Sequence, residues 1–206
     1  MEFIYFIIAL LIAVSVHEFA HALCADQLGD PTPRVAGRLT LNPFKHLDFL
    51  GTIMLFLVHF GWGKPVPINP RYFKRPLQYS ALTALSGPAA NFLIAIMIAV
   101  FLKHTWIFLP DFIYVILMTI FEINLVLGAF NLLPLPPLDG SKILGLFVPR
   151  KYSNLYLKYL SVGPVYFVIF AAADYFLFSR WFGFSIFGYI TGIIYNYLHA
   201  LLFLGA

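Results

Sequence analysis

Two histidines and a glutamate lie close together near the start of the chain, in the order His17-Glu18-Phe19-Ala20-His21. In a helix, residues four apart face the same side, so both imidazoles can reach one ion at about 2.0 to 2.1 Å. Glu18 beside them is placed to take a proton from water at such an ion and to pass it to a leaving amine. The pattern therefore predicts a catalytic zinc site.

The surroundings of this motif strengthen the prediction, because short patterns recur by chance. Ile, Ala, Leu and Val fill the preceding turns, so His17, Glu18 and His21 fall inside an apolar run long enough to span a bilayer. A single histidine there could be an interfacial side chain bonded to water or to a carbonyl. Three ionisable side chains in one span are costly, and this indicates a functional site.

A catalytic zinc site usually has three protein ligands, and Asp139 is the candidate for the third. Three prolines in the stretch 131–140 stop the preceding helix, and Gly140 permits a sharp bend that returns a carboxylate towards the metal. His17 lies about 21 Å along its helix from Phe3, near the far end of its span. Asp139 follows the same end of a later span that runs in the same direction. The carboxylate and the two histidines are therefore expected at the same depth in the membrane. By itself, Asp-Gly is also common in surface turns.

The composition predicts an all-α polytopic membrane protein. Of the 206 residues, 61% are apolar and 11% are charged, whereas soluble domains carry about a quarter charged residues. At about 20 residues per span, the chain has room for five to six transmembrane helices and none for a second soluble domain. We expect one domain over 1–206. The net charge of +4 indicates contact with membrane lipid, and no basic tract suggests nucleic-acid binding.

Five apolar runs are long enough to cross a membrane. They cover residues 3–25, 80–102, 111–133, 161–178 and 184–205. A sixth run, 47–60, is interrupted by Asp48 and His59 and is short for a crossing. Gly and Pro residues over 61–67 then favour extended backbone, which at membrane depth must be buried in protein or line a cavity.

The distribution of positive charge distinguishes two topologies. If 47–60 enters the membrane and returns on the same side, Lys103 and Arg180 lie on one side and the other eleven Lys and Arg residues lie opposite. If 47–60 crosses, the split is eight against five. Cytoplasmic loops are enriched in Lys and Arg. We therefore expect five crossings, an outer N-terminus, a cytosolic C-terminus and an active site nearer the cytosol.

The two motifs together resemble the site-2 protease family of intramembrane zinc metalloproteases. H-E-x-x-H lies in one span, and residues 131–140 read N-x-x-P-x-P-P-L-D-G after a later span. Residues 87–91, Gly-Pro-Ala-Ala-Asn, also resemble a core helix of the family. The resemblance covers a three-helix catalytic core over about 3–145, with accessory helices over about 155–205. The short link at 103–111 indicates a minimal prokaryotic member, without the PDZ or CBS domain of longer relatives.

The resemblance implies one zinc ion per chain, bound by His17, His21 and Asp139, with Glu18 as general acid and base. It implies that Asn131 holds the substrate or stabilises the oxyanion, a role that suits an amide donor. The implied substrate is a transmembrane segment of another membrane protein. The implied location is a prokaryotic cytoplasmic membrane.

A membrane-dipping β-hairpin or re-entrant segment is expected to hold the substrate. Its exposed edge would pair with an unwound substrate strand, because strand addition supplies hydrogen-bond partners for an extended backbone. The residues expected to bind substrate are Lys64, Pro65, Val66, Asn69 and Asn91.

Other features stay open at this point. Cys24 lies on the same helix face as the histidines and is either a fourth candidate ligand or a core side chain. Glu122 and Asp174 either line a water path or bond to a neighbouring helix. A membrane metal-ion transporter is the alternative function, but it should have further ligands on a second helix and a His-rich loop, and the sequence has neither. The sequence does not indicate the substrate's identity or the oligomeric state.

Overall fold

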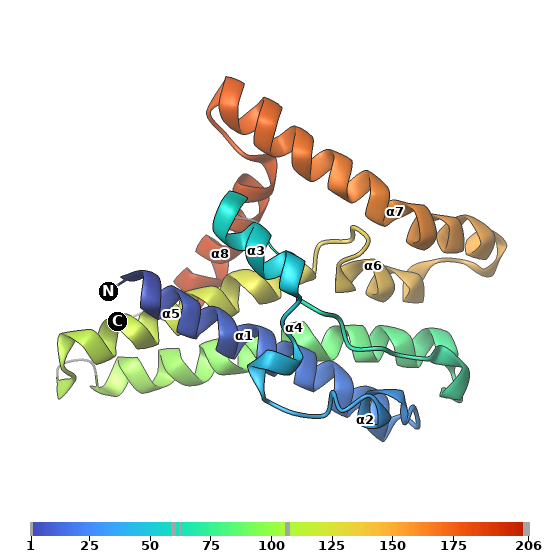
Figure 1. Cartoon of the computed structure of the whole chain (residues 1–206), viewed down its shortest axis with the longest axis horizontal. Coiled ribbons are helices and arrows are strands. Elements are labelled where there is room, and N and C mark those ends of the chain that lie inside the picture. The colour runs from blue at the N-terminus through green and yellow to red at the C-terminus, as the bar shows by residue number, and fades with distance from the viewer. Residues whose placement is uncertain (1, 59–60, 62, 106–107, 204–206) are drawn as a thin grey trace.

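The computed structural model describes residues 2–58, 61, 63–105 and 108–203. The described chain is almost entirely helical (Figure 1). The helices are α1 (Glu2–Gln27), α2 (Thr32–Val35), α3 (Phe49–Val58), α4 (Pro76–Thr105), α5 (Asp111–Asn131), α6 (Asp139–Leu144), α7 (Ser153–Ala173) and α8 (Ile186–Phe203). A π-helix, Asp174–Phe182, continues α7.

Within the described part of the chain, four helices are long and apolar enough to cross a membrane. They are Glu2–Gln27, Pro76–Thr105, Asp111–Asn131 and Ser153–Phe182. Three of these helices contain the predicted spans 3–25, 80–102 and 161–178, and α5 covers the predicted span 111–133 up to Asn131. The fifth predicted span, 184–205, corresponds to α8, although its last residues lie outside the described part of the chain.

The run 47–60 contains α3, a helix of ten residues. Ten residues extend about 15 Å along a helix, about half of the hydrocarbon thickness of a bilayer. Whether this segment crosses or re-enters stays a prediction, and His59 lies outside the described residues. The expected β-hairpin amounts, among the described residues, to one isolated antiparallel bridge between Leu47 and Gly63.

Helices α1, α4 and α5 pack against one another and form the bundle that positions the site (Figure 1). Small side chains let the backbones of α1 and α4 approach closely. The buried alanines are Ala9, Ala13, Ala22 and Ala25 on α1, and Ala81, Ala84, Ala95 and Ala99 on α4. Phe121 and Leu125 of α5 complete an apolar cluster with Ala95 and Ala99.

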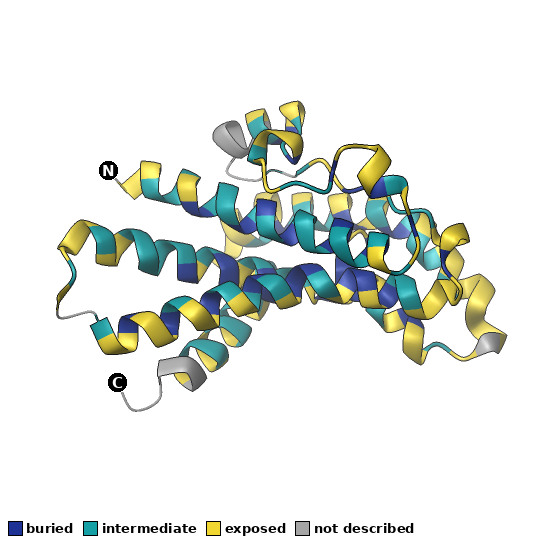
Figure 2. Cartoon of the chain, turned by 90° about the horizontal axis from the view of Figure 1, so that it is seen from below, coloured by how far each residue is buried: buried dark blue, intermediate teal, exposed yellow. Residues whose placement is uncertain are grey.

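The outward faces of the helices are apolar. Buried residues concentrate where the helices face one another, and exposed residues line the outside of the bundle (Figure 2). Large exposed side chains include Leu93, Met97, Val100, Val165, Val168 and Ile169. Since water would oppose such a surface, lipid is the medium that covers it. The chain is an integral membrane protein.

Candidate metal centre

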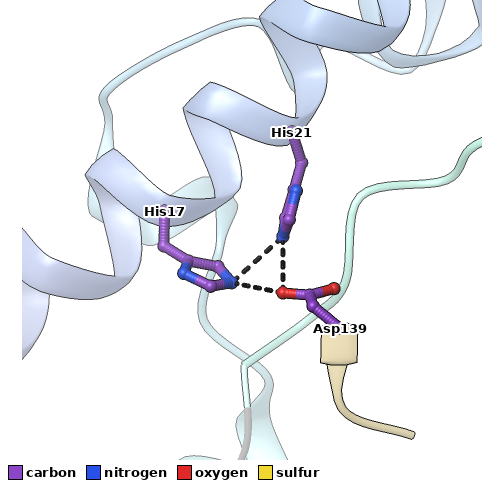
Figure 3. Close-up of side chains that lie close together, drawn as sticks. All are labelled: His17, His21 and Asp139. Carbon is purple, nitrogen blue, oxygen red and sulfur yellow. Dashed lines mark hydrogen bonds and ion pairs between the residues drawn. The ribbon is translucent and has the colours of Figure 1, made fainter. Parts of the chain in front are cut away.

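Three buried side chains converge on one point inside the bundle. His17 and His21 lie one turn apart on α1, and Asp139 is the first residue of α6. Asp139 Oδ2 lies 3.1 Å from His17 Nε2 and 3.0 Å from His21 Nε2, and the two Nε2 atoms are 3.0 Å apart (Figure 3). Each residue is 6% exposed. The described residues contain no second group of this kind.

Asn91 determines which nitrogen of His17 faces the centre. The Asn91 amide nitrogen donates to the Ala13 carbonyl at 3.0 Å and to the Asn124 side-chain oxygen at 2.9 Å. Its oxygen therefore faces His17 Nδ1, 2.6 Å away, and accepts a hydrogen bond from it. With the proton on Nδ1, the Nε2 lone pair points to the centre.

His21 is oriented in the same way by a backbone group of α4. Its Nδ1 lies 2.6 Å from the Thr83 carbonyl oxygen, which can only accept. The proton on Nδ1 leaves Nε2 free to act as a ligand. Gly87 lets α4 come this close, because a Cβ there would lie 2.5 Å from His21 Nε2 and 2.7 Å from His17 Cε1.

The loop that carries Asp139 is folded tightly against the end of α5. A Cβ at Gly140 would collide with the carbonyl groups of Leu132 and Leu133, so only glycine fits this return. Helix α7 holds the outer side of the loop: Tyr156 Oη donates to the Ser141 carbonyl at 3.0 Å, and Tyr159 Oη donates to the Pro134 carbonyl. An accessory helix outside 3–145 thus supports the site.

The Asp139 carboxylate lies between the two imidazoles and a lysine. Lys142 Nζ lies 3.6 Å from the other carboxylate oxygen, Oδ1. Oδ2 is therefore the oxygen that faces the two imidazoles, while Oδ1 faces a cation.

The donor set fits zinc. Two imidazole nitrogens and one carboxylate oxygen, each with a lone pair, converge at 3.0 to 3.1 Å. Ligands about 2.0 to 2.1 Å from a tetrahedral ion lie about 3.3 Å from one another, close to the observed spacing. Without a cation, three acceptors would face each other in a buried site. Three protein ligands also leave the fourth position that a catalytic zinc site requires.

A cavity of about 400 Å³ lies beside this centre, between α1, α3, α5 and α7. Its apolar wall comprises Ile7, Leu10, Leu11, Val14, Leu47, Leu127, Phe130, Pro137, Leu138 and Phe167. Polar lining is contributed by His17, Glu18, Thr52 and Asn131. The cavity therefore joins the metal centre, the predicted general base and the predicted oxyanion donor in one apolar space.

The predicted catalytic side chains are both held by backbone groups. Glu18 Oε2 accepts a hydrogen bond from the Val66 N–H at 3.0 Å. The Asn131 amide donates to the Leu127 carbonyl at 3.0 Å, within its own helix. Their catalytic roles stay predictions, but the structure places both in the cavity.

The residues expected to bind substrate lie in two different places. Lys64, Pro65, Val66 and Asn69 belong to the extended segment 63–69, which we call the strap. Lys64 and Pro65 are exposed and Val66 is buried. Asn91 has no exposed surface and lies behind His17. Substrate binding by Asn91 stays a prediction, and the contacts that it makes in this structure serve to orient His17.

Several residues that support the site carry no sequence motif. They are Thr83, Asn124, Tyr156 and Tyr159. A backbone carbonyl such as that of Thr83 has no sequence signature. Asn124, a polar residue in the apolar run of α5, is the one of these that a search for buried amides would have found.

The residues left open by the sequence now have positions. Cys24 is not part of the group of metal-ligating side chains. Asp174 is buried and accepts hydrogen bonds from Ser185 Oγ and from the Ile186 N–H, both at 2.6 Å, so it caps the start of α8. Glu122 is exposed on α5, with Oε1 3.4 Å from Tyr195 Oη of α8.

Comparison with known proteins agrees with this site. The family model described as Peptidase family M50 matches residues 106–172, which include Asn131 and Asp139. YwhC of Bacillus subtilis is 42% identical over 156 residues, covering 70% of this chain and 69% of that protein. Rip2 of Mycolicibacterium smegmatis is 30% identical over 149 residues, covering 67% of this chain and 55% of that protein.

A shorter match joins the chain to MJ0392 of Methanocaldococcus jannaschii, 34% identical over 82 residues, which are 40% of this chain and 24% of that protein. The words zinc metalloprotease stand in the names of all three relatives. No solved structure matches the chain significantly. The buried zinc-binding group, the membrane helices and these similarities together show that the chain belongs to peptidase family M50, the site-2 protease family of zinc metalloproteases.

Proposed function

We propose that this metalloprotease cuts a transmembrane segment of another membrane protein, at a bond in or near the bilayer. The observation that carries the proposal is the apolar cavity into which His17, Glu18 and Asn131 all project. A largely apolar wall suits the side chains of a transmembrane segment and not those of a soluble loop. Such cleavage would serve regulated intramembrane proteolysis.

Different residues of the chain are proposed to carry out different parts of peptide hydrolysis. Zinc, when held by His17, His21 and Asp139, supplies a Lewis acid that activates water and polarises a carbonyl. Glu18 takes a proton from the attacking water and returns it to the leaving nitrogen. The Asn131 amide, which has a second N–H beyond the one given to Leu127, donates to the oxygen on which charge develops.

The strap is the proposed contact surface for an unwound substrate. A helical substrate has no accessible peptide bond until it is extended, and strand addition would give its backbone new partners. The N–H groups of Lys64, Val66 and Asn69 already donate to His46 O, Glu18 Oε2 and Asp30 Oδ2. Pairing of a substrate with these three groups would therefore require an exchange of hydrogen bonds.

The proposed topology has five crossings and a re-entrant α3. The ten-residue length of α3 supports re-entry. The charge distribution supports an outer N-terminus, a cytosolic C-terminus and an active site near the cytosolic side of a prokaryotic cytoplasmic membrane.

The experiment compares the purified chain with its Glu18→Gln variant in detergent. Both are assayed on a panel of single-span peptides, and zinc is measured in the same samples. We expect cleavage by the parent only, with about one zinc per chain in both, because the variant keeps the ligands and loses the base. Cleavage by both would exclude Glu18 as the base. Zinc in both with no cleavage, together with zinc flux in proteoliposomes, would favour transport instead.

A further inference from the structure

We infer that Arg38 is a positioning residue, which fixes the strap so that the Val66 N–H points at the carboxylate of Glu18. The inference rests on the proposed function, because it assigns Arg38 a role in proteolysis through Glu18. Arg38 lies between α2 and α3, outside the metal-ligating group and outside both motifs.

Arg38 clamps two successive peptide groups of the strap. Its Nη2 atom donates to the Lys64 carbonyl and to the Pro65 carbonyl, each at 3.0 Å. The side chain is nearly buried, with 5% of its surface exposed. Nη2 carries two N–H groups, so this one nitrogen bridges the two successive peptide oxygens.

The fixed peptide groups immediately precede Val66. The Val66 N–H belongs to the same peptide unit as the Pro65 carbonyl, so holding that oxygen also sets the direction of the N–H. This N–H donates to Glu18 Oε2 at 3.0 Å. Pro65 and Pro67 on either side of Val66 further restrict the backbone. Arg38 therefore acts on the carboxylate of Glu18 through one rigid peptide plane.

Two further hydrogen bonds anchor the strap, one on each side of Val66. The Lys64 N–H donates to the His46 carbonyl at 2.8 Å, and the Asn69 N–H donates to Asp30 Oδ2 at 2.6 Å. Asp30 and His46 have no exposed surface. The anchors hold the ends of the strap in place without reaching Glu18, so the direction of the Val66 N–H depends on the clamp from Arg38.

A purely structural role explains Arg38 less well. Within the described residues no carboxylate forms an ion pair with it, and its buried Nη1 atom has no hydrogen-bond partner. Removing an unpaired guanidinium from water is costly, and an apolar side chain would fill the space at less cost. The contact that requires a guanidinium here is the one with the two strap carbonyls.

A double-mutant cycle tests the inference by activity. Arg38→Gln and Val66→Pro are made singly and together, with Arg71→Gln, at an exposed arginine, as the control. We expect each single variant to lower kcat/KM about 10- to 100-fold with zinc content nearly unchanged, because the orientation of the Glu18 carboxylate is lost while the metal-ligating side chains stay in place. The double variant should be no slower than Val66→Pro. Arg38→Lys should fall between the parent and Arg38→Gln.

Losses that multiply in the double variant, or a loss of zinc in Arg38→Gln, would overturn the inference. Since Val66→Pro can also disturb folding, amide exchange provides a second measurement that needs no substrate. In chain labelled with ¹⁵N-valine, the Val66 amide should exchange at least about tenfold faster in Arg38→Gln and in Glu18→Ala than in the parent, as loss of a hydrogen bond predicts.

Equal protection of the Val66 amide in the parent and in Arg38→Gln would contradict the role of Arg38. The proposed function and the positioning role of Arg38 are contradicted by different results. A parent that cleaves no peptide contradicts the proposed function, while the exchange rates of Val66 still decide whether Arg38 positions the strap.

Discussion

His17 Nδ1 lies 2.6 Å from the side-chain oxygen of Asn91, a residue 74 positions later in the chain. This contact joins α1 to α4 at the metal centre. Because the Asn91 amide nitrogen is committed to Ala13 and Asn124, the amide cannot turn over without losing two hydrogen bonds. The orientation of one zinc ligand is therefore built into the packing of three helices.

Asn91→Ala is expected to weaken zinc binding about 10- to 100-fold, because the imidazole of His17 loses the partner that sets its tautomer and orientation. Zinc affinity is measured by competition with a chelator of known affinity. Asn154→Ala, at an exposed position on α7, is the matched control and should bind zinc as the parent does. Unchanged affinity in Asn91→Ala would show that packing alone orients His17.

Gly87→Ala is expected to destabilise the chain by about 1 to 3 kcal/mol, the usual effect of overpacking, and to lower its zinc content. The added methyl would lie 2.5 Å from His21 Nε2, so α4 or the imidazole must move. Gly192→Ala is the control, because nothing lies within 4 Å of a Cβ there. Thermal unfolding of the zinc-loaded variants gives the comparison. A Gly87→Ala variant as stable and as zinc-rich as Gly192→Ala would contradict the geometry of this approach.

Tyr156→Phe is expected to speed zinc dissociation by a few-fold, corresponding to about 1 kcal/mol for one lost hydrogen bond. The hydroxyl group donates to the Ser141 carbonyl and so steadies the short helix that begins at Asp139. Zinc release into a fluorescent chelator measures the rate. Tyr166→Phe removes a hydroxyl from an exposed side chain of the same helix and should leave the rate unchanged.

Val14→Phe is expected to raise KM for a single-span peptide about tenfold, which corresponds to about 1.4 kcal/mol of lost binding. Val14 lines the cavity on the face of α1 that also carries Glu18. Zinc content should not change, since the substitution leaves the three side chains of the metal-ligating group in Figure 3 in place. Leu93→Phe, on the exposed face of α4, is the control. An unchanged KM in Val14→Phe would place the substrate elsewhere.

Local periodicity made part of the site predictable. The spacing of His17 and His21 puts both on one helix face whatever surrounds them, because the helical repeat is a property of the backbone. The apolar runs that became α1, α4, α5 and α7 were evident for the same reason, since a bilayer requires long apolar helices. Asp139 was predictable from the prolines that end the helix before it.

The hydrogen-bond partners of the segment after α3 were not predictable from the sequence. Gly and Pro residues after α3 correctly indicated extended backbone. Beyond its one bridge between Gly63 and Leu47, however, the strap bonds to the Arg38, Asp30 and Glu18 side chains rather than to a neighbouring strand. Which partners an extended segment finds depends on what packs beside it, and prolines 65 and 67 remove donors that a ladder would need.

The sequence by itself therefore identified the three candidate zinc ligands, the candidate base beside them and the apolar helices that carry them. The tertiary structure decided how each ligand is oriented, through Asn91, the Thr83 carbonyl and Tyr156. It also decided which residues meet at Glu18. The physical reason is that a helix repeat is local, whereas a hydrogen bond between helices depends on the packing of segments far apart in the chain.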